Sequence, residues 1–96
     1  MNSEPREARL KRMRMRAWRR GTKEMDLILG PYADSMLTRM DEATLKHFDL
    51  LLEENDQDLY LWVTGAQPAP AEHAELLAAI GANARGRLQP TPEPGR

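Results

Sequence analysis

Apolar residues recur at helical spacing along most of this chain, and this periodicity limits the possible folds more than any other feature. Between positions 25 and 40 they stand three or four residues apart, as Met25, Ile28, Leu29, Tyr32, Met36 and Met40. That spacing places them on one face of an α-helix. The alternating stretch "RMRMR" at residues 12–16 is too short and too charged to indicate a strand. The sequence therefore predicts an all-α fold.

Start and stop signals divide the chain into about five short helices that pack as a small bundle. The first covers residues 6–19, is basic and carries Leu10, Met13 and Ala17 as its apolar stripe. The second starts after Gly21. Proline in its Gly30-Pro31 step removes a backbone donor and predicts a kink or a break. Whether that step bends one helix or separates two is left open by the sequence.

Three further helices follow. The third is expected to begin at Asp41 as N-cap and to bury three side chains, Leu45, Phe48 and Leu52. "ENDQD" at residues 54–58 predicts a short polar turn. The fourth helix carries Leu59, Trp62 and Val63 and is expected to end at Gly65. The fifth runs from about 71 to 87 and is expected to present Ala74, Leu77, Ile80 and Ala84.

Length and composition predict one small helical domain over residues 1–88, with residues 1–5 mobile. The proline-rich tail "QPTPEPGR", residues 89–96, has nothing to bury and is expected to be disordered. The chain has no cysteine, which excludes disulfides and thiolate metal sites and fits a reducing compartment. No stretch approaches the roughly 20 apolar residues of a membrane span. We therefore expect a cytoplasmic protein without membrane insertion.

The residue types that carry enzyme chemistry do not form a recognisable pattern. His47 and His73 have no metal-ligand partner at helical spacing, and a surface or half-buried structural role is expected for each. The sequence has no phosphate-binding glycine loop and no dinucleotide fingerprint. We therefore expect no catalytic residue and no metal site.

Charge is distributed unevenly, with the change of sign at "WRRGTKEMD", residues 18–26. Nine of the 14 basic residues lie between Arg6 and Lys23, whereas ten of the 15 acidic residues lie between Glu24 and Asp58. Such asymmetry bears on partners rather than on fold.

This junction has two compatible interpretations. In the first, Gly21 is a helix N-cap and Glu24, at the third helical position, completes half of a capping box. In the second, the absence of a Cβ at Gly21 lets a partner approach, while Arg20 and Glu24 display donors and acceptors beside it. Physical reasoning from the residues leaves both open.

The stretch "DQDLYLW", residues 56–62, carries a second set of candidates. Leu59 and Trp62 are expected in the core, and Asp56 and Asp58 are expected to cap the short helix, with interface contacts as a secondary role. Tyr60 falls off the core face and is an interface candidate.

Taken in order, "RRGTKEMDLILGPY" and "LLEENDQDLYLWVTG" resemble the succinate dehydrogenase assembly factor (SdhE) family. The family's Arg-Gly-x-x-Glu motif is met by Arg20, Gly21 and Glu24, followed by Asp26 and Leu27. Its second signature, Asp-x-Asp-Leu-(Tyr/Phe)-x-Trp, is met at Asp56, Asp58, Leu59, Tyr60 and Trp62. The resemblance covers roughly residues 9–87. Thr22, the very basic "RMRMR" and the proline-rich tail depart from the family pattern but leave the motif residues untouched.

The resemblance implies a five-helix assembly factor that is not itself an enzyme. Such a factor binds the flavoprotein subunit of succinate dehydrogenase, with that of fumarate reductase as a second partner, and promotes covalent attachment of FAD. It holds no cofactor stably and acts on the FAD of its partner, near Arg20, Gly21 and Glu24. The implied partner-binding residues are Arg19, Arg20, Gly21, Glu24, Asp26, Asp56, Asp58 and Tyr60.

Two other functions compete with this one. The basic first helix could bind nucleic acid, although only 5% of residues are aromatic and no recognition motif is present. A basic face packed against acidic helices of the same chain is favoured, and we expect no nucleic-acid partner. The third function is that of an antitoxin-like interaction protein, which would bind a small toxin and leave flavin content unchanged.

Overall fold

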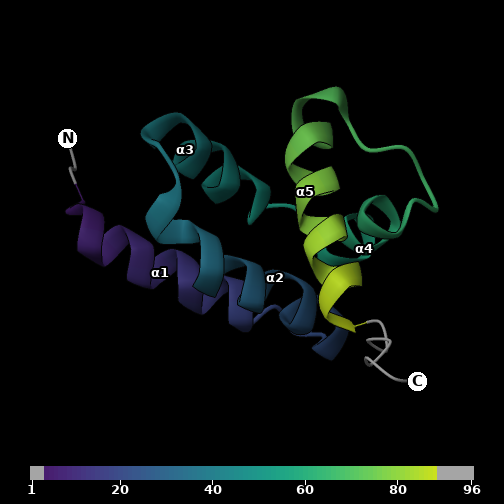
Figure 1. The fold of residues 1–96 in the computed structure, drawn as a ribbon, viewed down its shortest axis with the longest axis horizontal. Helices are drawn as coiled ribbons and strands as arrows, with labels where there is room; N and C mark the ends of the chain where they lie inside the picture. The colour runs from purple at the N-terminus through teal and green to yellow at the C-terminus, as the bar shows by residue number, and fades with distance from the viewer. Residues whose placement is uncertain (1–3, 89–96) are drawn as a thin grey trace, which may run out of the picture.

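A computed structural model describes residues 4–88, and within them the chain is helical, which confirms the all-α prediction (Figure 1). Its elements in chain order are α1 (Arg6–Trp18), α2 (Lys23–Met36), the 3-10 helix η1 (Leu37–Arg39), α3 (Glu42–Leu51), α4 (Asp56–Thr64) and α5 (Ala71–Leu88). The tail expected to be disordered, 89–96, lies outside the described residues, as do residues 1–3.

The helices surround one apolar core. Helices α1 and α2 run alongside each other in opposite directions, α3 follows after η1, and α5 crosses α2 and α4 (Figure 1). Every helix contributes to the buried cluster, whose fully buried members include Met13, Leu29, Leu45, Phe48, Leu59 and Ile80. Within this cluster the ring centroids of Tyr32 and Phe48 lie 5.9 Å apart.

Local capping fixes most helix ends. Asp41 Oδ1 accepts from the Thr44 amide at 2.8 Å, and Gly65 ends α4 with φ +82°, so both predictions are confirmed. The expected caps of α4 are wrong, because Asn55 holds that position and accepts from the Asp58 amide at 2.8 Å. Helix α4 therefore begins at Asp56, inside the stretch predicted to be a turn.

The Gly30-Pro31 step does not break α2, which continues as one helix from Lys23 to Met36. Of the two alternatives that the sequence left open, a break that separates two helices is thereby excluded. Gly30 has a packing role instead: a Cβ at this position would lie only 2.3 Å from Cδ2 of Trp18, so the indole rests on the bare helix backbone. Trp18 Nε1 then donates to Asp34 Oδ2 at 3.2 Å, one turn further along α2.

The predicted apolar face of α5 is right in part. Leu77, Ile80 and Ala84 are buried, but Ala74 is exposed and His73, at 4% exposure, is buried in its place. A helix face that starts at His73 and one that starts at Ala74 continue through the same residues, Leu77, Ile80 and Ala84. The prediction took Ala74 as the first buried residue because alanine is apolar and histidine is polar. The hydrogen-bond partners of His73, described below, explain why the histidine turns inward.

None of the helices described in residues 4–88 combines the length and the hydropathy needed to cross a membrane.

Candidate functional site

The loop between α1 and α2, residues 19–22, places the first motif at one end of the molecule. Thr22, not Gly21, is the N-cap of α2, and its hydroxyl accepts from the Met25 amide at 3.3 Å. Glu24 is therefore the second helical residue, and the predicted capping box is wrong. Gly21 has φ +105°, a conformation that L-residues rarely adopt, so the turn itself requires glycine.

Arg20 joins this loop to the turn between α3 and α4. Its Nε donates to Asp56 Oδ1 at 2.8 Å, Nη1 to the Leu52 carbonyl at 2.7 Å and Nη2 to the Glu54 carbonyl at 2.6 Å. The side chain is only 8% exposed. All three guanidinium nitrogens thus serve contacts within the chain. We call this set of contacts the Arg20 clasp.

The clasp brings the two sequence signatures together. Asp26 Oδ1 accepts from the Arg20 amide at 2.6 Å, which holds the loop against the first turn of α2. Asp58 is kept at the start of α4 by a 3.0 Å contact from Asn55 Nδ2. Among the predicted partner-binding residues, Arg20 and the aspartates therefore form hydrogen bonds within the chain. The aspartates are Asp26, Asp56 and Asp58.

Arg19, Gly21, Glu24 and Tyr60 are the predicted site residues that are exposed. Tyr60 is 43% exposed, as its position off the core face predicted. Within the described part of the chain, neither the Glu24 carboxylate nor the Tyr60 phenol forms a hydrogen bond or ion pair. These two groups are thus available to a partner.

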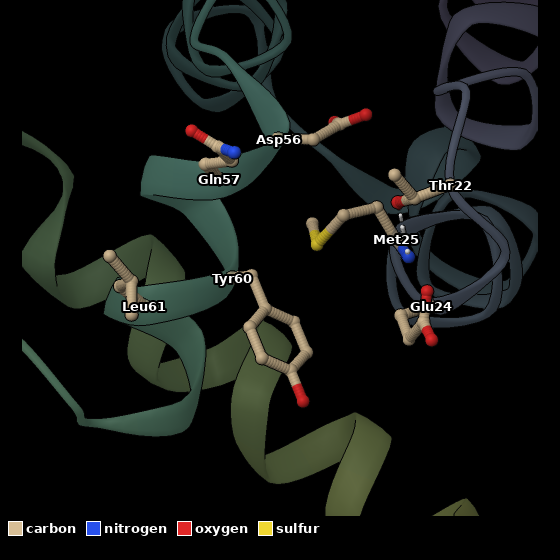
Figure 2. A pocket seen from close by; sticks show the side chains of 7 residues that line it. All are labelled: Thr22, Glu24, Met25, Asp56, Gln57, Tyr60 and Leu61. Atoms are coloured by element: carbon tan, nitrogen blue, oxygen red, sulfur yellow. Dashed lines mark hydrogen bonds between the residues drawn. The ribbon is translucent and has the colours of Figure 1, made fainter.

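A surface groove of about 510 Å³ separates the first turn of α2 from α4 (Figure 2). We call it the α2–α4 groove. The residues that line it are Thr22, Glu24, Met25, Asp56, Gln57, Tyr60 and Leu61. Figure 2 shows the Met25 thioether, which is buried, directed toward α4 beneath the groove, with the Glu24 carboxylate and the Tyr60 hydroxyl at its rim. An apolar floor with a few polar groups suits binding of another molecule.

Sequence reasoning missed a hydrogen-bonded chain that joins the buried His73 to two half-buried residues, His47 and Glu54. His47 Nε2 lies 3.2 Å from His73 Nδ1, and His73 Nε2 lies 3.1 Å from Glu54 Oε2. In the arrangement with a carboxylate at Glu54 and a neutral imidazole at His73, His73 donates from Nε2 and its Nδ1 accepts from His47 Nε2. His73 is fully buried, so the expected surface or half-buried role holds only for His47.

The same chain touches the clasp, because the Glu54 carbonyl accepts from Arg20 while its carboxylate meets His73. Glu72 Oε2 also lies 3.9 Å from His73 Nε2, so ligand atoms of Glu54, Glu72 and His73 come within 4.8 Å of one another. The two histidines, which have no metal-ligand partner at helical spacing, therefore meet each other and Glu54 only through the fold. Residues 26 positions apart give no local signal of such a contact.

The basic face of α1 is turned toward acidic side chains of this chain, as favoured from the sequence. Arg9 pairs with Glu42, Arg12 with Asp49 at 2.7 Å and Arg16 with Glu53 at 2.7 Å, a row that links α1 to α3 and the residues after it. Hydrogen bonds from Arg12 lower the pKa of Asp49, and those to Asp49 and Glu4 raise the pKa of Arg12.

Comparison with known proteins gives one family and a set of relatives. Residues 11–84, which include both motifs, match the family described as "Flavinator of succinate dehydrogenase". The chain is 38% identical over 80 residues to "Succinate dehydrogenase assembly factor 2, mitochondrial" of Mycosarcoma maydis, covering 83% of this chain and 34% of the relative. It is 39% identical over 62 residues to "FAD assembly factor SdhE" of Legionella pneumophila (strain Lens), covering 65% and 78%. This chain spans 20% and 18% of two further fungal relatives, from Aspergillus flavus and Aspergillus terreus.

Proposed function

This chain belongs to the family of succinate dehydrogenase flavinators, and we propose that it is a non-catalytic assembly factor for a flavoprotein. It binds the flavoprotein subunit of succinate dehydrogenase and promotes covalent attachment of that subunit's FAD, while holding no cofactor stably itself. The flavoprotein subunit of fumarate reductase is the second candidate partner. The cytoplasmic location expected from the sequence is part of this proposal.

One observation carries the proposal beyond family membership: the Arg20 clasp makes a single surface of the two motifs. Arg20 anchors the first motif to Asp56 of the second, and Glu24 and Tyr60 then face the same groove without internal partners. An enzyme would need reacting groups aligned with one another. This groove offers a binding surface, consistent with a factor that orients another protein around its own flavin.

In this arrangement Arg20 is a positioning residue, and Glu24, Tyr60 and Arg19 are the contacts. The buried guanidinium fixes the loop, and the loop fixes the start of α2 on which Glu24 stands. Gly21 acts by allowing the turn. This division of roles predicts that Arg20 and Gly21 variants lose stability and partner binding together, whereas Glu24 and Tyr60 variants lose binding alone.

The test is co-expression with the succinate dehydrogenase flavoprotein subunit in cells that lack their own factor. Covalent flavin is read as fluorescence in a denaturing gel, with the fumarate reductase subunit in a parallel arm. Wild type is expected to raise the signal, and Tyr60→Ala to reduce it about tenfold through lost contact area. Leu50→Ala is the matched control, because Leu50 is 56% exposed on α3, away from the groove.

Gly21→Ala is a weaker probe, since strain at φ +105° would lower activity even if no partner touched the loop. If wild type leaves the fluorescence of both subunits unchanged, the proposed function is wrong. If wild type raises it and Tyr60→Ala does so equally well, the function stands and the contact surface lies elsewhere.

A further inference from the structure

The α2–α4 groove combines an apolar floor with an acidic rim, and this combination identifies what it can receive. We infer that it takes a segment of the flavoprotein in which an arginine or lysine stands beside an apolar side chain. The cation meets Glu24, and the apolar side chain lies on Tyr60 and Leu61, above the buried Met25 (Figure 2). This inference rests on the proposed function and specifies the chemistry of its partner.

Charge provides the first argument. Two of the lining residues, Glu24 and Asp56, are carboxylates, and none is a cation. Arg20 is the cation bonded to Asp56, but its three nitrogens are engaged and the side chain is 8% exposed. The Glu24 carboxylate has no partner in residues 4–88. A basic side chain on the partner would therefore pair with Glu24, whose carboxylate is the only unpaired charge among the lining residues.

The same charges argue against free FAD as the occupant. Its diphosphate would approach the unpaired Glu24 carboxylate, and like charges at contact distance repel. The amino end of α2 favours anions through its backbone amides, but Thr22 caps it and Glu24 already occupies its first turn. The groove therefore fits a cationic protein segment better than a nucleotide.

Polar groups around the floor suit a peptide backbone. The Gln57 amide and the Tyr60 phenol are free of hydrogen bonds within the described residues, and both stand at the groove on α4. Together they supply donors and acceptors for an extended chain that crosses between α2 and α4. Tyrosine beside an apolar floor is a typical anchor of protein interfaces.

Glu24 also has a purely local explanation, which the experiment must exclude. A carboxylate in the first turn of a helix interacts favourably with the helix dipole. That role predicts a slightly lower melting temperature for Glu24→Gln, with partner binding unchanged. Contact with a cation predicts weaker binding and a weaker dependence of binding on salt.

The first measurement is the affinity of the purified full-length protein for the flavoprotein subunit, at about 50 and about 300 mM salt. Glu24→Gln is expected to weaken binding about tenfold at low salt and to flatten the salt dependence. Glu24→Lys is expected to weaken it about a hundredfold or more. Glu75→Gln and Glu75→Lys, at an exposed position of α5, are the matched controls and should stay within about twofold of wild type.

The second measurement identifies the occupant. A photoreactive p-benzoylphenylalanine replaces Gln57, and the cross-linked flavoprotein peptide is mapped by mass spectrometry. It should contain an arginine or lysine within two positions of an apolar residue. A cross-linked segment without a basic residue, unchanged binding by Glu24→Lys, or saturable binding of free FAD that Tyr60→Ala abolishes would each overturn the inference. If wild type neither binds the subunit nor raises its covalent flavin, the proposed function fails first.

Discussion

Arg20 shows how much a single side chain can determine in a small helical protein. Its guanidinium joins the loop between α1 and α2 to the turn between α3 and α4, more than thirty residues further along the chain. It does so by donating to one carboxylate and two backbone carbonyls. Arginine suits this task because its planar group presents donors in several fixed directions, whereas lysine presents one compact ammonium. Removing the guanidinium takes a donor away from three part-buried acceptors, of which the Leu52 carbonyl alone keeps a second donor, Arg16 Nη2 at 3.3 Å.

We therefore predict that Arg20→Lys lowers the free energy of unfolding by about 3 kcal/mol, because a shorter buried cation cannot reach all three acceptors. Urea unfolding followed by circular dichroism measures the change. Arg19→Lys is the control: Arg19 is exposed one position earlier, and its replacement should change stability by less than about 0.5 kcal/mol. Equal effects of the two substitutions would contradict the clasp.

Residue-level predictions from the sequence succeeded where the signal was local. Asp41 and Gly65 were identified as helix ends because a cap needs only its own neighbours along the chain. The burial of Arg20 could not be predicted, because two of its acceptors are main-chain carbonyls. Every residue has such a carbonyl, so the sequence does not indicate which ones an arginine will reach. The capping box at Glu24 failed because Thr22, one position later than Gly21, is the better cap.

At the scale of elements, contact between α1 and α2 determines what the Gly30-Pro31 step means. Glycine inside a helix ordinarily costs stability relative to alanine, about 1 kcal/mol. At Gly30 the missing Cβ makes room for Trp18, whose ring would otherwise meet the new carbon at 2.3 Å. Helix propensity and packing therefore oppose each other here, and packing decides.

The same substitution at two helical glycines should thus change stability in opposite directions. Gly30→Ala is expected to lower the free energy of unfolding by about 2 kcal/mol through overpacking against Trp18. Gly86→Ala, in α5 with no atom near the added Cβ, is expected to raise it by up to about 1 kcal/mol. Thermal unfolding of both variants tests this. Stabilisation by Gly30→Ala would show that the indole moves aside at no cost.

The link between α1 and α3 depends on ionised carboxylates and should weaken in acid. Hydrogen bonds from Arg12 lower the pKa of Asp49 below its usual value of 3.8. A group with a lowered folded-state pKa stabilises the protein above the unfolded value and loses this contribution as the pH falls through the folded value. Asp49 therefore contributes in full at neutral pH and progressively less below about 3.8.

Asp49→Asn should consequently be less stable than wild type at pH 7, and the gap should close as the pH falls below about 3.8. Urea midpoints measured across the acid range give both curves. Glu75→Gln, at an exposed position of α5, serves as the control for loss of a carboxylate. A gap that stays constant into strong acid would mean that the Arg12–Asp49 contact is not formed in solution.

The positions of the helices followed from periodicity, but their rotation and mutual contacts did not. On α5 the inward turn of His73 depends on His47 of α3 and Glu54 of the following turn. Apolar periodicity counts histidine as polar and therefore predicts that Ala74 is buried in its place. The groove likewise joins residues from two segments, so the sequence indicated Glu24, Asp56 and Tyr60 as candidates but not the groove that they line together.

For the molecule as a whole, the charge asymmetry of the sequence is largely neutralised inside the fold. The nine cations between Arg6 and Lys23 include six arginines that contact carboxylates or carbonyls of the same chain. Lys11, Arg19 and Lys23 are the three without a partner among residues 4–88. Nucleic-acid binding requires several free cations on one face, because affinity grows with the number of phosphates neutralised.

We therefore predict no binding of this protein to a duplex DNA or a single-stranded RNA at about 150 mM salt. Fluorescence anisotropy of labelled oligonucleotides measures this, with the flavoprotein subunit as the positive binding partner in the same buffer. A triple variant Glu42→Gln, Asp49→Asn, Glu53→Gln removes three carboxylates that pair with arginines of α1, although Arg12 keeps its contact with Glu4, and it should raise nucleic-acid affinity at low salt. Micromolar binding by wild type with a steep salt dependence would instead mean that the α1 arginines leave their acidic partners for phosphate. The primary function would then have to be sought on that helix and not in the α2–α4 groove.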